Sequence, residues 1–263
     1  MNTKASGEAA ADRTVWAVTG SDALTFLQGL VSNDLRPLET APGIVWCALL
    51  TPQGKYLADF FVARPPDAPA DRPLLIDIAS ALAPATLRRL TMYRLRADVR
   101  ITPLDRHVQR GLGVPPSDAL PDPRHPALGW RAWRAGPGTA PAIDWDRIRV
   151  AQLIPESGVE LIPDDSYILE AGFERLHGVD FRKGCYVGQE VTARMKHKTE
   201  LRKGLARVAI DGSAPVGTEI LAYGKPAGTL FTQSRGEAIA HLRFDRAEGP
   251  MTAGTATLRL LPG

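Results

Sequence analysis

The sequence after Gly204 constrains the fold more than any other stretch of the chain. Short runs alternate apolar and polar residues there: "LARVAI", "TEILAY", "AGTLFTQS", "AIAHLRF" and "ATLRLL". Glycine, proline and aspartate interrupt these runs about every eight to twelve residues, which is typical of small antiparallel barrels and sandwiches. We therefore predict a small antiparallel β-barrel or sandwich over residues 201–263.

The part of the chain before this β-region mixes helical and strand-like patterns. Gly20–Asp34 starts with capping residues and spaces Leu24, Leu27 and Val31 on one helical face. The apolar runs Gly43–Thr51 and Lys55–Ala63 flank the sequence "TPQG", which has proline and glycine where a tight turn prefers them. We expect a helix followed by a β-hairpin, and hence an α+β fold.

Further elements follow the same mixed pattern. The expected elements are strands at 73–79 and 97–104, helices from Ser80, over 145–153 and over 166–177, a short strand at 129–135, and a proline-rich loop at 113–128. The predicted domains are a first α+β part over residues 13–103, a second over 104–200, which may interleave with the first, and the barrel.

Composition limits the cellular setting. The chain has 263 residues, 44% of them hydrophobic, which is enough for a sizeable core. We find no apolar run of membrane-spanning length, no secretory h-region, and fewer arginines and serines near the start than a mitochondrial presequence has. Two cysteines are too few for a disulfide framework. These features predict a cytoplasmic protein that does not associate with membranes, and we expect a monomer.

The stretch "FRKGCYVGQEVTARMKHK" (Phe181–Lys198) carries the most distinctive chemistry. Cys185 lies between Gly184 and Gly188, just before a predicted helix, and Lys183 is close by. A helix N-terminus and nearby cations favour thiolate over thiol, so a reactive or metal-seeking thiolate is one reading. The alternative is a small residue packed under a glycine turn. Cys47, inside "IVWCALL", is expected to pack in the core.

Several site classes find no support. No histidine near Cys185 belongs to a nucleophile signature, no Cys/His set has zinc spacing, and neither a Walker loop nor G-x-G-x-x-G occurs. We predict no metal site. Arg182, Lys183, Arg194, Lys196, Lys198, Arg202 and Lys203 form a basic span, which reads either as a solvated helix face or as an anion site. With a net charge of +3, we expect no direct nucleic-acid partner.

The sequence "KGCYVGQE" (Lys183–Glu190) resembles the signature of YgfZ-type folate-binding proteins, which are relatives of the glycine-cleavage aminomethyltransferase. The stretches "GSDALTFLQGLVSND", "ALLTPQGKYLADFFV", "IPDDSYILEAGFERLHGVDF" and "GTLFTQSRGEAIAHLR" resemble other parts of that family. Together they extend the resemblance over nearly the whole chain, from about Val15 to Leu261.

The resemblance implies two α+β, ferredoxin-like parts around a central hole that accepts tetrahydrofolate or a one-carbon derivative, followed by the barrel. It also implies an accessory role in assembling or repairing iron–sulfur enzymes, for example tRNA-modifying radical-SAM enzymes, through transient contacts. Lys183 and Cys185 are the positions it marks as catalytic or functionally sensitive. The candidate folate-binding residues are Tyr186, Gly188, Gln189, Glu190, Arg194, Asp59 and Asn33.

Two departures from the aminomethyltransferase pattern argue against its reaction. The hairpin has Ala58 beside a single acid, Asp59, where the transferase has adjacent acids. In "RVAQL" (Arg149–Leu153), Ala151 stands where the transferase has its pterin-binding glutamate. We therefore expect no classical turnover. The alternatives are a folate-dependent aminomethyltransferase or demethylase, and a tRNA-binding module suggested by the basic span.

Overall fold

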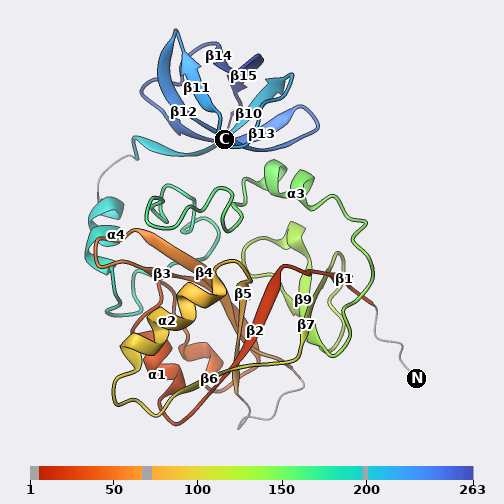
Figure 1. Cartoon of the computed structure of the whole chain (residues 1–263), viewed down its shortest axis with the longest axis vertical. Helices are drawn as coiled ribbons and strands as arrows, with labels where there is room; N and C mark the ends of the chain where they lie inside the picture. The colour runs from red at the N-terminus through yellow and green to blue at the C-terminus, as the bar shows by residue number, and fades with distance from the viewer. Residues whose placement is uncertain (1–5, 67–72, 198–200, 263) are drawn as a thin grey trace. The chain divides into compact units, whose positions relative to one another are not determined.

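The computed structural model describes residues 6–66, 73–197 and 201–262 (Figure 1). The chain forms two compact units, and each is discontinuous in sequence. The first comprises Met1–Ala142 and Glu174–Gln189, and the second comprises Ile143–Phe173 and Glu190–Gly263. The predicted boundary between residues 103 and 104 stays a prediction.

A five-stranded antiparallel sheet organises the first unit. Its strands, in spatial order, are β3 (Gly43–Leu50), β4 (Tyr56–Arg64), β5 (Leu74–Ala79), β2 (Arg13–Thr19) and β6 (Arg100–Pro103). β3 and β4 pair as a hairpin, with Cys47 opposite Phe60, which confirms the hairpin predicted from the "TPQG" turn. Two helices, α1 (Ala23–Gln28) and α2 (Ala83–Arg94), pack on one face.

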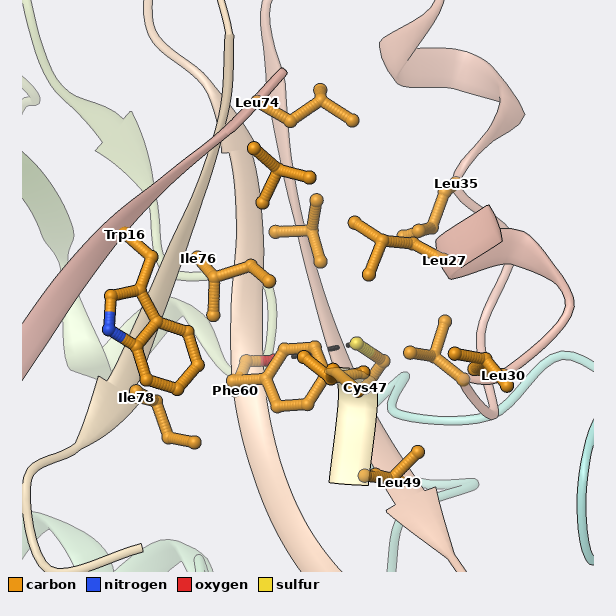
Figure 2. Packing of buried hydrophobic residues seen from close by; sticks show 14 of the residues in the cluster. Trp16, Leu27, Leu30, Leu35, Cys47, Leu49, Phe60, Leu74, Ile76 and Ile78 are labelled. Atoms are coloured by element: carbon orange, nitrogen blue, oxygen red, sulfur yellow. Dashed lines mark hydrogen bonds between the residues drawn. The ribbon is translucent and has the colours of Figure 1, made fainter. Parts of the chain in front are cut away.

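Alternate residues of each strand face opposite sides of this sheet. Phe60 of β4 and Ile76 of β5 contribute to the cluster under the helices, together with Leu27 of α1 and Leu90 of α2. Figure 2 shows this packing around Cys47, whose thiol donates to the Phe60 carbonyl oxygen at 3.6 Å.

The opposite face of the sheet is partly polar. Asp77 of β5 accepts hydrogen bonds from Arg13 of β2 and from Arg131 of a second sheet. That second sheet has the spatial order β1 (Glu8–Ala9), β7 (His107–Gly111), β9 (Trp130–Arg134), β8 (Leu120–Pro121). The Arg131 guanidinium also stacks on the Phe61 ring at 4.2 Å. A buried ion pair therefore connects the two sheets.

The second unit contains α3 (Trp145–Gln152) and a closed antiparallel barrel. The barrel strands, in spatial order, are β10 (Lys203–Asp211), β13 (Glu237–Arg243), β12 (Lys225–Ser234), β11 (Glu219–Ala222), β14 (Met251–Ala253) and β15 (Ala256–Leu260). Val150 of α3 packs against Phe231 and Ile239 of the barrel. The α+β class and the C-terminal barrel are confirmed.

Some predicted elements differ in the structure. The helix predicted over Gly20–Asp34 covers only six residues, because Gly29 caps it. The predicted helix over 166–177 is wrong: the segment is a series of turns, in which Gly172 has a φ of +79° and His177 a φ of +56°. A helix requires negative φ at every residue, so these two positions interrupt it. The loop at 113–128 contains β8 and a short 3-10 helix, η2 (Pro126–Leu128); another, η1 (Arg36–Leu38), follows α1.

Candidate functional site

The loop that carries Cys185 is docked on the segment that follows α1. The Ser32 hydroxyl donates to the Gly178 carbonyl oxygen at 2.6 Å, and the Asp180 amide donates to the Ser32 carbonyl oxygen at 3.1 Å. The same hydroxyl accepts a hydrogen bond from the Ala48 amide of β3 at 2.9 Å. Ser32 thus connects the loop to both the helix and the sheet.

Lys183 secures the loop most directly. Its ammonium group donates to the carbonyl oxygens of Gln28 at 2.5 Å and Val31 at 2.6 Å, at the end of α1. Gln28 is the last residue of α1, where a helix leaves acceptors without intrahelical partners, and Val31 lies just beyond the helix. The lysine thus acts as a C-terminal cap supplied from a distant part of the sequence and also holds the segment that follows. The ammonium also lies 4.8 Å from the centre of the Tyr186 ring, within cation–π distance.

This environment changes the acidity of Lys183. The residue is 6% exposed, and burial lowers the pKa of its ammonium from 10.5 to about 8, although nearby groups such as Asp34 act in the opposite direction. The amine consequently titrates much closer to neutrality than an exposed lysine does.

Cys185 lies on the exposed side of this secured loop. Gly184 has a φ of +99° and Gly188 a φ of +84°, values that L-residues with side chains rarely adopt. A Cβ at Gly188 would lie 2.5 Å from the carbonyl oxygen of Thr51. Gly188 therefore lets the loop approach the hairpin closely, while the Cys185 thiol stays accessible. The exposed position disfavours the reading of a packed structural cysteine.

Cys47 has a different environment. It is fully buried in the core cluster, and burial raises the pKa of its thiol well above the ordinary value, although Lys183 acts in the opposite direction. The predicted core role of Cys47 is confirmed.

A cavity of about 550 Å³ adjoins the loop within the first unit. Its walls are formed by Asn33, Asp34, Ile44, Val45, Trp46, Pro123, Glu174, His177, Val179, Asp180, Phe181 and Arg182. The Asn33 amide donates to the carbonyl oxygens of Trp46 and His177, at 2.8 and 2.7 Å. Asn33 is thus the only predicted folate-binding residue among those that line this cavity, and it also holds two of its walls together.

Asp59 is enclosed rather than presented to a ligand. It is 3% exposed, and its carboxylate accepts hydrogen bonds from Trp46 Nε1 at 2.8 Å and from the Tyr56 hydroxyl at 2.6 Å. A pterin ring needs an accessible carboxylate to accept its paired N–H donors. The geometry of Asp59 does not fit that role.

The remaining predicted folate-binding residues are divided between the two units. Tyr186 and Gly188 are buried and Gln189 is half-buried, so they serve the loop's own packing. Glu190 and Arg194 are exposed on α4 (Gln189–His197), in the part that belongs to the second unit. Lys198 of the basic span lies outside the described residues.

Sequence reasoning missed a buried polar cluster in the second unit. Arg149 donates to Glu160 at 2.5 Å, and the Glu160 carboxylate also accepts the Thr232 amide at 3.2 Å. All three side chains are buried. These residues are far apart in sequence, and no spacing rule relates them, so only the folded structure identifies the cluster.

The site offers one accessible thiol, that of Cys185. Among the described residues, no three His, Cys, Asp or Glu side chains are grouped so as to hold a metal ion. No helix in the described part of the chain is long and apolar enough to cross a membrane.

Comparisons with known proteins place this geometry in context. Residues 202–262 match the family model described as the CAF17 C-terminal beta-barrel domain. The glycine cleavage system aminomethyltransferase T from Bartonella henselae aligns with a TM-score of 0.74 over 99% of this chain and 86% of its own, at 13% identity. The aminomethyltransferase-like fold is thereby confirmed.

Sequence relatives are named as iron–sulfur cluster assembly factors. IBA57 of Mus musculus is 30% identical, and the alignment covers 95% of this chain and 80% of the relative. The IBA57 homologue of Mycosarcoma maydis is 35% identical over 73% of this chain, which spans only 54% of that relative.

These relatives bear on two sequence predictions. Both are named as mitochondrial, and this contradicts the predicted cytoplasmic location, which rested on an N-terminal composition unlike a presequence. The YgfZ-type resemblance itself stays a prediction, whereas the predicted relationship to iron–sulfur cluster assembly factors is confirmed. The chain belongs to the family of IBA57 iron–sulfur cluster assembly factors.

Proposed function

We propose that this protein is an accessory factor for assembling or repairing iron–sulfur clusters and that it acts through the Cys185 thiol. The observation that carries the proposal is the exposed thiol of Cys185. It lies on a loop that the buried side chain of Lys183 anchors to the end of α1. Family membership supports the same role. The cluster is the cargo, and its remaining ligands come from a partner protein in a transient complex.

The geometry suggests a separate role for each of the two signature residues, Cys185 and Lys183. Cys185 is the only described cysteine that can reach a partner, because Cys47 is enclosed in the core. Lys183 fixes the loop so that the thiol is presented in one place, which reduces the conformational entropy lost when a shared complex forms. Lys183 is therefore a positioning residue in this proposal.

Complementation with matched variants tests the role of the thiol. In cells lacking the protein, Cys185→Ser is expected to leave the activity of iron–sulfur enzymes at the level of the deletion, while Cys47→Ser restores it. Both variants remove one sulfur, so the comparison separates the accessible thiol from the buried one. Full restoration by Cys185→Ser, at wild-type protein levels, would contradict the proposal.

The proposal includes tetrahydrofolate as a ligand and tRNA-modifying radical-SAM enzymes among the clients. Support for folate comes from the sequence resemblance and from the aminomethyltransferase-like fold. The exposed Arg194 is the residue proposed to pair with the glutamate tail of the folate. Because Asp59 is enclosed, we do not extend the proposal to aminomethyl transfer.

Calorimetric titration with tetrahydrofolate tests the ligand separately from the thiol. We expect wild type and Cys185→Ser to bind alike and Arg194→Glu to bind more weakly. Arg259→Glu, an exposed barrel substitution with the same charge change, is the control. Absence of heat with wild-type protein would remove folate from the proposal and leave the thiol role standing.

A further inference from the structure

The outer surface of α2, the turn after it and the first residue of β6 concentrate positive charge. We call this the α2 surface and define it by Arg88, Met92, Arg94, Leu95, Arg96 and Arg100, all of which are exposed. Among the residues that the structure describes, none of its four arginines lies within ion-pair distance of a carboxylate. The charge is local, because the whole chain carries a net charge of only +3.

Nearby acids are engaged elsewhere. Asp98 accepts hydrogen bonds from the Ser21 amide at 3.1 Å and from its hydroxyl at 3.2 Å. Asp22 accepts the Asp98 amide at 2.8 Å. These two carboxylates tie the turn after α2 to the start of α1. Hydrogen bonds from Ser21 and the nearby charge of Arg100 lower the pKa of Asp98, and Arg94 donates to the Val99 carbonyl oxygen at 3.4 Å. Arg88 and Arg96 are therefore the arginines of this surface that are most available for a partner.

Two large apolar side chains accompany the arginines. Met92 is 69% exposed and Leu95 is 89% exposed, whereas α2 buries Ala83, Thr86 and Leu90 on its opposite side. Arg88, Met92 and Leu95 follow the i, i+4, i+7 spacing that places residues on one helical face. Arginine and methionine next to exposed apolar groups are enriched at protein–protein interfaces.

Leu95 is held in an unfavourable backbone conformation. It ends α2 with φ 43° and ψ −106°, a region that residues with a Cβ rarely occupy. A glycine fills nearly the same conformation at Gly129, with φ 63° and ψ −112°. A leucine in this position costs stability and is almost wholly exposed, which is the pattern that points to a binding role.

We propose that the α2 surface docks an acidic protein, with Met92 and Leu95 as apolar anchors and the arginines as its charged contacts. A membrane is disfavoured because α2 keeps its apolar face in the core, while interfacial helices bury theirs in lipid. RNA is disfavoured because the surface offers no exposed aromatic ring for stacking; Tyr93 is half-buried against the core cluster. The inference depends on neither Cys185 nor folate.

Binding of a defined acidic probe tests this surface. The probe is a short fluorescent peptide in which glutamate pairs alternate with single leucines; a glutamine version is its control. We expect the full-length protein to bind the glutamate peptide, with affinity that falls as salt is raised. The double variant Arg88→Glu/Arg96→Glu should bind at least about ten times more weakly. Lys225→Glu/Arg259→Glu, which makes the same charge change on the barrel, should bind like wild type.

Leu95→Gly separates a binding role from a structural one. Glycine relieves the backbone strain, so the melting temperature of the variant protein should rise while the affinity of the variant for the peptide falls. Two results would overturn the proposal. One is equal peptide binding by the wild type and the Arg88/Arg96 variant. The other is binding to RNA, or to vesicles of phosphatidylcholine and phosphatidylglycerol, that is tighter than binding to the peptide and that the same arginine changes abolish.

Discussion

At the scale of single residues, Lys183 illustrates how a signature side chain can act on the backbone. A lysine two residues from a cysteine suggests catalysis or thiolate stabilisation. In the structure, the ammonium group instead caps the carbonyl oxygens of Gln28 and Val31. These two hydrogen bonds anchor the loop that carries Cys185.

Replacing Lys183 by methionine keeps much of the side-chain volume and removes the two hydrogen bonds. We expect the free energy of unfolding to fall by about 2–3 kcal/mol, because two carbonyl oxygens lose a charged donor. Urea denaturation measures the change, and Cys185→Ser, which alters an exposed residue, should leave stability unchanged. A Lys183→Met protein as stable as wild type would contradict the capping role.

The lowered pKa of Lys183 makes stability depend on alkaline pH. The group titrates at about 8 in the folded state and near its ordinary value of 10.5 in the unfolded chain. Between these values the unfolded chain binds more protons, so raising the pH favours folding. We expect the urea midpoint of wild type, relative to Lys183→Met, to rise from pH 8 to pH 10. Parallel pH curves for the two proteins would show that Lys183 titrates normally.

At the scale of elements, Asp77 is the main polar connection between the two sheets of the first unit. Arg13 Nε lies 2.6 Å and Arg131 Nη2 2.9 Å from its carboxylate oxygens. The desolvation of Asp77 is outweighed by these two cations, and the pKa of the carboxyl is lowered. The ion pairs fix how β5 and β9 pack against each other.

Asp77→Asn should therefore destabilise the protein by about 3–5 kcal/mol, since it removes the carboxylate that pairs with two buried guanidinium groups and leaves Arg131 only the longer contact with Asp122. Chemical denaturation provides the measurement. Asp245→Asn, which breaks an exposed pair with Arg243, is the matched control and should cost less than about 1 kcal/mol. Similar losses for both variants would be inconsistent with a special role for the buried pair.

Elements with strong local patterns were predictable from the sequence, and long-range contacts were not. Alternation and the "TPQG" turn predicted the hairpin, and regular Gly/Pro spacing predicted the barrel. The segment 166–177 has helix-like spacing, but Gly172 adopts a positive φ and its apolar residues are buried through turns. The contact between Lys183 and Gln28 joins residues 155 positions apart, and no local pattern encodes it.

At the scale of the whole molecule, each unit has its own hydrophobic core. The first unit contains the cluster around Leu27, Phe60 and Ile76. The second contains the barrel cluster and the contact of Val150 with the barrel. The exposed thiol belongs to the first unit and the barrel to the second. Separate cores allow local opening of one unit without global unfolding.

Glu160→Ala tests whether the units open separately. This change removes the acceptor of Arg149 and Thr232 in the second unit and should destabilise that unit by about 3 kcal/mol. This loss corresponds to a roughly hundredfold larger fraction of molecules in which the second unit is open. We expect to observe it as faster hydrogen exchange of the β12 amides. Pulsed alkylation of Cys47 reports on the first unit, because its thiol is fully buried there. We expect the alkylation rate of Cys47 to match that of wild type. An equal acceleration of both signals would mean that the two units unfold as one.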